Sequence, residues 1–61
     1  MRYEVHVGLD NAAFEPPGPE LARILRYLAD HVEGQDVEEL RLPARLRDVN
    51  GNRVGFAVVQ D

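Results

Sequence analysis

The spacing of apolar residues changes twice along these 61 residues, and this change constrains the fold more than any other feature. Apolar and polar residues alternate from Arg2 to Leu9, recur at helical spacing from Leu21 to Val32, and alternate again on both sides of Asn50-Gly51. Alternation is typical of a half-buried strand, and i, i+3, i+4 spacing is typical of an amphipathic helix. The sequence therefore predicts one α+β domain, residues 1–61, with the element order β-α-β-β.

Proline and glycine residues set the expected boundaries. The Pro16 to Pro19 stretch excludes regular structure before a helix, and Gly34 provides a C-terminal cap. Phe14, in the preceding loop, is expected to cover one end of the core. The predicted elements are a strand at 2–9, a loop at 10–18, a helix at 19–33, a strand at 40–48, a turn at 49–51 and a strand at 52–60.

The turn at 49–51 determines which residues of the hairpin face each other. A two-residue Asn50-Gly51 loop would place the two apolar rows on opposite faces of the sheet. A type I turn that starts at Asp48, with Gly51 left-handed in a G1 bulge, avoids this conflict. We therefore expect the opposite pairs Arg47–Arg53, Leu46–Val54, Ala44–Phe56 and Leu42–Val58.

The strand order follows from Pro43 and from the apolar content of the last strand. Proline cannot donate to a strand ladder, so Pro43 indicates that the second strand lies at an edge. The third strand is the most apolar and belongs at the centre. This predicts a three-stranded antiparallel sheet in the order 1-3-2, with the single helix packed on one face.

One helix covers only one face of such a sheet, so the other face is a candidate binding surface. The predicted register places on it an arginine strip beside small side chains. The hypothetical binding residues are Arg41, Arg45, Arg47, Arg53, Gly55, Ala57 and Val59. The alternative is that these arginines only keep an open sheet soluble. The free backbone of the two outer strands offers a second binding mode, in which another chain extends the sheet.

The residue types argue against catalysis and against metal binding. The chain has no Ser, Thr, Cys or Lys, which supply most activated nucleophiles. Asp48 to Asn52 is similar to the start of a calcium loop, but Arg53 and Val59 occupy the positions that need Gly and Glu. His6 and His31 each lack further ligands at metal spacing. We expect no catalytic residues, no metal site and no cofactor.

The composition also indicates in which compartment the chain works and what kind of partner it binds. The absence of cysteine favours the cytoplasm, and no apolar run is long enough to span a membrane. The net charge of −4 argues against a nucleic-acid partner, because phosphate binding depends on excess Lys and Arg. A chain this short buries little apolar surface, and association into a homodimer is a common remedy.

Two sequence blocks carry a resemblance to a known group of proteins. These blocks are Asp10-Asn11-Ala12-Ala13-Phe14-Glu15 and Leu46 to Gly55, with a generic helix, Glu20 to Asp30, between them. Together they resemble a group of small bacteriophage and mobile-element proteins of unknown function. The Val37 to Arg45 region departs from the shortest members. The resemblance implies a phage or prophage origin and supplies no catalytic residues.

Two functions from different classes remain as expectations. The first is a non-catalytic accessory module that binds a protein and thereby inhibits or modulates a host protein. The second is a small nucleic-acid-associated regulator that uses the arginine-rich sheet face. The net charge and the shortage of aromatic residues for base stacking favour the first.

Overall fold

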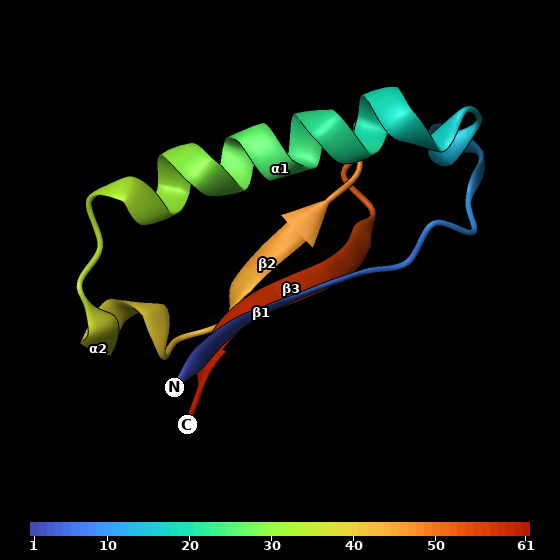
Figure 1. Ribbon diagram of the computed structural model, residues 1–61. Helices are drawn as coiled ribbons and strands as arrows, with labels where there is room; N and C mark the ends of the chain where they lie inside the picture. The colour runs from blue at the N-terminus through green and yellow to red at the C-terminus, as the bar shows by residue number, and fades with distance from the viewer.

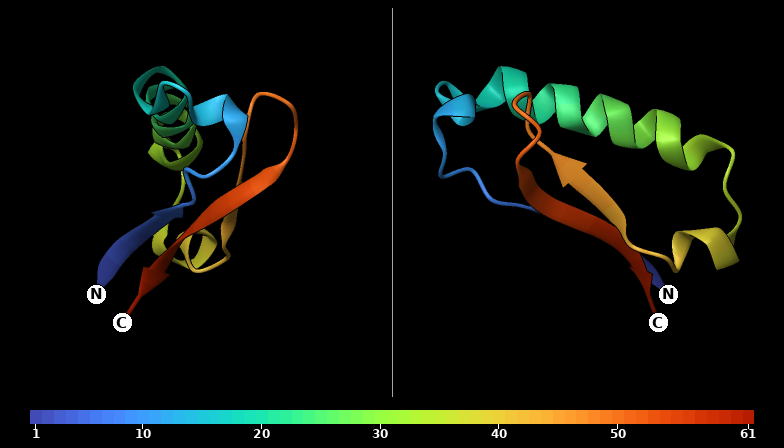
Figure 2. Two further views of the ribbon diagram at one scale, coloured as in Figure 1. Left: turned by 90° about the vertical axis from the view of Figure 1, so that its right-hand side faces the viewer. Right: turned by 180° about the vertical axis from the view of Figure 1, so that it is seen from behind.

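The three alternating stretches pair into one antiparallel sheet in the computed structural model, which describes residues 1–61 (Figure 1). The strands are β1 (Arg2–Val7), β2 (Ala44–Arg47) and β3 (Arg53–Gln60), and β3 lies between the other two. One long helix, α1 (Pro17–Glu33), runs along one side of the sheet (Figure 2). The predicted α+β class and the strand order 1-3-2 are confirmed.

The connection between β1 and α1 supplies part of the core. Asn11 accepts a hydrogen bond from the Ala13 N–H at 2.9 Å and so caps a short 3₁₀ turn, Ala12–Phe14. This turn directs Phe14 inward, where it is 2% exposed, as expected. It packs in one cluster with residues of α1, β2 and β3. The cluster consists of Phe14, Ile24, Leu28, Leu46 and Ala57.

A short helix stands directly before the predicted second strand and includes its first residue, Leu40. This helix, α2 (Val37–Leu40), has a capping box at its start: the Glu39 N–H donates to the Asp36 side chain at 3.1 Å, and the Glu39 carboxylate accepts from the Asp36 N–H at 3.4 Å. Such a box satisfies backbone donors that would otherwise lack partners. The strand predicted at 40–48 is therefore shorter than expected, and β2 begins only at Ala44.

The predicted hairpin turn is confirmed. The Gly51 N–H donates to the Asp48 carbonyl at 3.0 Å, and the Asp48 N–H donates to the Asn52 carbonyl at 2.9 Å. Gly51 has a φ of 84°, a conformation in which a side chain would be strained. Arg47 lies opposite Arg53, also as expected.

A second irregularity, which the sequence analysis missed, follows directly after this pair. Leu46 lies opposite Gly55, so that Val54 has no opposite residue in β2. The extra residue is a β-bulge, and it reverses the side on which the following residues lie. The expected pairs Leu46–Val54, Ala44–Phe56 and Leu42–Val58 are therefore wrong. The observed pairs are Leu46–Gly55, Arg45–Phe56 and Ala44–Ala57.

Candidate functional site

The structure does not bring the seven predicted binding residues together on one open face. Three of them, Gly55, Ala57 and Val59, share the side of the sheet on which Leu46 and α1 lie, because of the bulge at Val54. Ala57 is fully buried, and Val59 is 9% exposed. The prediction that these three residues line the uncovered face was wrong. The β3 residues on that face are Phe56, Val58 and Gln60.

The four predicted arginines remain at the surface but do not form one strip. Arg41 follows α2 rather than lying in a strand, and it donates to Asp61 at 2.6 Å. Arg47 donates to the Gly51 carbonyl at 3.2 Å. Arg45 lies opposite Phe56, and Arg53 lies at the start of β3. The carboxylate of Asp61 offsets the charge of Arg41, so this surface is less basic than its sequence suggests.

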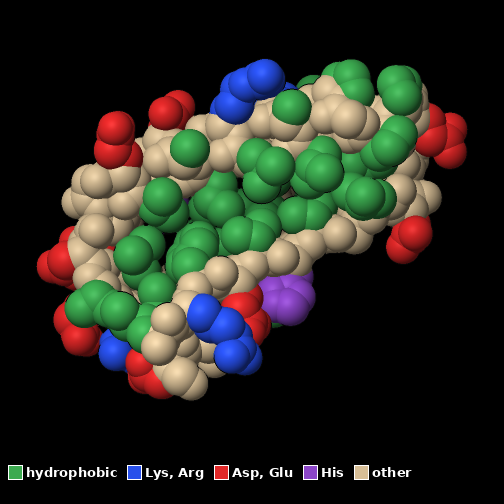
Figure 3. All heavy atoms as spheres, in the orientation of Figure 1, with side chains coloured by type: hydrophobic (Ala, Val, Ile, Leu, Met, Phe, Trp, Pro, Cys, Tyr) green, Lys and Arg blue, Asp and Glu red, His purple; other side chains and the backbone are tan.

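The most distinctive surface is an apolar groove between α1 and β1. Figure 3 shows hydrophobic side chains gathered in a continuous band between the helix and the strand. The residues on the helix side of β1 are only partly covered: Tyr3 is 37% exposed and Val5 is 40% exposed. Leu25 of α1 is 45% exposed. We call this surface the α1–β1 groove. It comprises the exposed or half-buried residues Tyr3, Val5, Val7, Leu21, Leu25 and Val32.

Helical geometry explains why the groove is open on the β1 side. Residues 20, 24 and 27 form one row of α1, and residues 21, 25, 28 and 32 form a neighbouring row. Ile24 of the first row lines a hollow of about 330 Å³ beside Arg45 and Arg47 of β2. Val32 of the second row lines a hollow of about 310 Å³ beside Tyr3. The first row thus lies toward β2 and the second toward β1.

The total surface area agrees with an incompletely covered core. Only 9 of the 61 residues are buried, and the chain exposes 4329 Å². A compact monomeric protein of 6.9 kDa is expected to expose about 4,000 Å². The chain thus exposes slightly more surface than a compact monomer of its mass, and exposed apolar patches commonly mark binding sites. The groove is therefore the strongest candidate for a binding surface.

The two outer strands differ in how their free edges are protected. The edge of β2 is blocked, because Arg23 of α1 donates to the Arg47 carbonyl at 3.0 Å. Pro43 precedes β2, and Arg45 adds a charge along it. The edge of β1 between Tyr3 and Val7 contains no proline, and Glu4 is its one carboxylate, so its backbone is less protected than that of β2. The free edge of β1 borders the α1–β1 groove.

The hydrogen-bond alternation shows which backbone groups of β1 are free. The Gly8 N–H donates to the Val54 carbonyl at 2.8 Å, so residue 8 directs its backbone groups toward β3. In an antiparallel pair these directions alternate along the strand. Residues 2, 4 and 6 therefore face β3, while Tyr3, Val5 and Val7 direct their N–H and C=O groups to the free edge.

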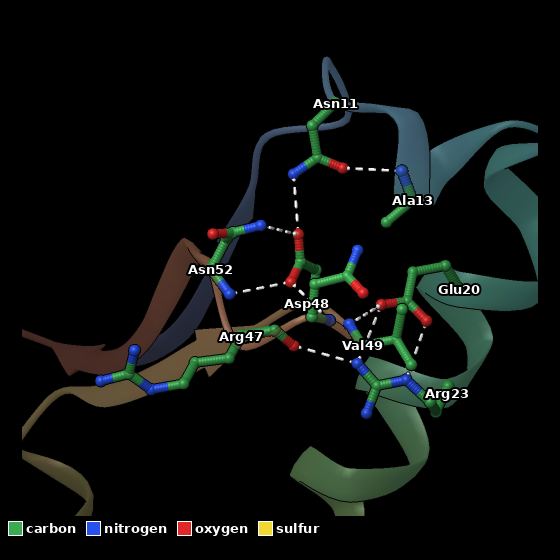
Figure 4. Close-up of polar contacts among 9 residues, drawn as sticks. Asn11, Ala13, Glu20, Arg23, Arg47, Asp48, Val49 and Asn52 are labelled. Atoms are coloured by element: carbon green, nitrogen blue, oxygen red, sulfur yellow. Dashed lines mark hydrogen bonds and ion pairs between the residues drawn. The ribbon is translucent and has the colours of Figure 1, made fainter.

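The segment that resembled a calcium loop is instead the centre of a structural network (Figure 4). Asp48 accepts four hydrogen bonds, of 2.8 to 3.0 Å, from Asn50, Asn52 and Asn11. Burial by itself raises the pKa of Asp48, but these hydrogen bonds together outweigh burial and hold the pKa below its ordinary value. Its oxygens are thus occupied by protein donors.

A second carboxylate joins α1 to the same turn. Glu20 accepts two hydrogen bonds from Arg23, at 2.8 and 2.9 Å, and one from the Val49 N–H at 2.7 Å (Figure 4). The Arg23 hydrogen bonds lower the pKa of Glu20, and the Val49 N–H adds to this effect, which exceeds the opposing effect of burial. These contacts of Glu20 were not predicted, although Glu20 and Arg23 have the i, i+3 spacing of a helical ion pair.

Hydrogen bonds within the protein account for the polar atoms of both networks. Every buried side-chain nitrogen or oxygen has a hydrogen-bond partner. No group of three or more His, Asp and Glu side chains is arranged to hold a metal ion. None of the helices has the length and apolar character needed to cross a membrane. The carboxylates of Asp48 and Glu20 therefore serve to hold the turn, the 3₁₀ segment and α1 together.

Comparison with known proteins returned no relative. No protein-family model, no curated protein and no solved structure matches this chain.

Proposed function

We propose that this chain is a non-catalytic protein-binding module whose binding surface is the α1–β1 groove. The observation that carries the proposal is the position of half-exposed apolar side chains, Tyr3, Val5 and Leu25, beside an unprotected strand edge. When a partner adds a strand to a sheet, burial of the neighbouring apolar surface stabilises the complex, and hydrogen bonds to the free backbone groups orient the added strand. A protein partner satisfies both requirements.

The sequence supports a particular setting for this role. The blocks around Asn11 and Asn50 resemble small phage and mobile-element proteins, so we propose that the partner is a host protein that the module inhibits or modulates. The absence of Ser, Thr, Cys and Lys supports a role without catalysis. The lack of cysteine also supports the reducing cytoplasm as the place of action.

Affinity capture from a bacterial lysate, with matched groove and control variants, tests the proposal. Leu25→Glu places a charge in the groove at a site that is 45% exposed, so the fold should persist. Leu42→Glu makes the same chemical change at a leucine that is 73% exposed and lies outside the groove. We expect Leu25→Glu to lose about tenfold or more of the captured partner and Leu42→Glu to retain it, because burying an unpaired carboxylate is costly.

A further pair of substitutions distinguishes the groove from the arginine surface. Arg45→Glu combined with Arg47→Glu reverses the charge along β2 and leaves the groove unchanged. We expect this variant to capture the same partner as the unmodified chain. Equal capture by the Leu25→Glu variant, or loss of capture with the arginine variant alone, contradicts the groove as the binding surface. Circular dichroism on each variant establishes that its fold is retained.

A further inference from the structure

We infer that the partner of the β1 edge is a second copy of this chain, bound antiparallel with Val5 opposite Val5. This inference rests on the proposed function for its surface only: it assigns the β1 edge to a second copy, and the foreign partner would then bind the apolar surface that the two joined grooves form. Antiparallel pairing of two β1 strands would join two three-stranded sheets into one sheet of six strands.

The sequence of β1 is complementary to itself about Val5. In this register Tyr3 lies opposite Val7 of the second copy, and Glu4 lies opposite His6 of the second copy. Opposite residues in an antiparallel pair share a face. The apolar residues of both strands therefore form one row on the helix side, continuous with both α1–β1 grooves. The polar residues form a second row on the other side.

The backbone groups that are free on β1 are those that this register requires. Tyr3, Val5 and Val7 direct their N–H and C=O groups outward, as the Gly8 to Val54 hydrogen bond establishes. The pair at Val5 and the two Tyr3–Val7 pairs would then exchange about six hydrogen bonds, two at each position. The pairs between Glu4 and His6 fall at the closely spaced positions, where opposite side chains contact each other.

Charge selects this register over its neighbours. Within one chain, Glu4 already accepts from Arg2 at 2.6 Å and lies 3.2 Å from the His6 ring nitrogen. In the register centred on Val5, each Glu4 gains a second imidazole across the interface. A shift centred on Glu4 places two carboxylates opposite each other, and like charges directly opposite are unfavourable. A shift centred on His6 places Glu4 opposite Gly8 of the second copy and so loses the contact between Glu4 and His6.

A third shift, centred on Tyr3, is also compatible in charge because it places Arg2 opposite Glu4. It pairs only residues 1 to 5 and leaves Val7 without a partner. Its apolar row would be shorter, and fewer free backbone groups would be satisfied. The register centred on Val5 uses the full length of β1 (Arg2–Val7) and buries the half-exposed Tyr3 and Val5 of both copies.

The size of this contact sets the expected affinity. One strand pair and the adjoining apolar row form an interface at the small end of specific contacts, below about 1,200 Å² in total. Association at such interfaces is commonly micromolar. Sedimentation equilibrium between about 1 µM and 1 mM therefore covers the transition. We expect the mass to rise from 6.9 kDa toward twice that value.

Two variants test the interface and its register. Val5→Pro removes an N–H that points to the free edge and is not used within the chain, so it should abolish the dimer while the monomer folds. His6→Glu places carboxylates opposite each other and should weaken the dimer by about tenfold. Adding Glu4→His to His6→Glu exchanges the two partners and should restore association to within about threefold. Leu42→Glu is the control and should dimerise like the unmodified chain.

The outcomes separate this inference from the proposed function. A chain that stays monomeric to 1 mM, or a dimer that the Val5→Pro variant retains, overturns the inference. Failure of the exchanged variant to recover, with His6→Glu impaired and both variants folded by circular dichroism, also overturns it. If Val5→Pro does not fold, the His6 and Glu4 variants decide alone, because both side chains lie on the outer face. Loss of lysate capture in Leu25→Glu tests the proposed function separately and does not require a dimer.

Discussion

Replacement of Gly55 by alanine tests the close approach of β1 and β3 beside the bulge. A methyl group at Gly55 would overlap the carbonyl oxygen of His6 and lie 2.9 Å from its carbonyl carbon, whereas real Cβ contacts stay beyond 3.0 Å. Both atoms belong to the backbone, so no side-chain rotation relieves the overlap. The strands must separate by roughly 1 Å, which costs about two strand hydrogen bonds, each worth about 1 kcal/mol, and about 1 kcal/mol of strain.

We therefore expect Gly55→Ala to lose about 3 kcal/mol, and to lower the melting temperature by about 12–24 °C, which leaves little stability in so small a domain. Thermal and urea unfolding, followed by circular dichroism, measures both quantities. Gly8→Ala is the matched control in the same sheet, because its new methyl group would lie 3.6 Å from the Val54 carbonyl oxygen, an ordinary contact. Equal stability of the two variants would refute the close approach of β1 and β3 and, with it, the register.

Three further predictions concern the turn, the core and the acid dependence. Gly51→Ala should cost about 1–2 kcal/mol in urea unfolding, because Gly51 has a φ of 84°; an unchanged midpoint would contradict the left-handed turn. Leu46→Ala should cost about 2–5 kcal/mol, because Leu46 is fully buried, and a loss below about 1 kcal/mol would contradict a core centred there. The folded-state pKa values of Glu20 and Asp48 are lowered, so their stabilising effect is present above the ordinary values of 4.5 and 3.8 and is lost as pH falls through the lowered values. The melting temperature should thus decrease as the pH is lowered from about 4.5, and it should decrease less in the Asp48→Asn variant. A melting temperature that stays constant from about pH 5 to 2 would contradict the network.

The features that short-range patterns determine were predictable from the sequence. Alternation identified β1, helical spacing identified α1, and the residues Asp48 to Gly51 determined the turn and its left-handed glycine. The helix α2 was also readable in principle, because Asp36 and Glu39 have the spacing of a capping box. It was missed because no regular element was predicted between residues 33 and 40.

The bulge at Val54 could not be predicted with the same certainty, because tertiary contacts decide it. Residues 57 to 59 are all apolar, so their alternation does not indicate which side of β3 is buried. The one local signal was Gly55, since an isolated glycine in a strand often marks a bulge or a close approach of two backbones. The missed bulge changed the predicted site, because a shift of one residue moves side chains from one face of a strand to the other.

The same bulge explains why β1 is left partly uncovered. It directs Gly55 and Ala57, which have almost no side chain, toward the helix, so the volume of the core must come from other elements. Phe14, Ile24 and Leu46 supply it. Val7 of β1 packs against this cluster, whereas Tyr3 and Val5 lie beyond it and keep much of their surface in water. A partner that covers them adds the burial that this small core lacks, and by mass action its binding must also stabilise the fold. Occupation of the α1–β1 groove and thermal stability should therefore rise together with protein concentration if the partner is a second copy, and with the concentration of the foreign partner if it is not.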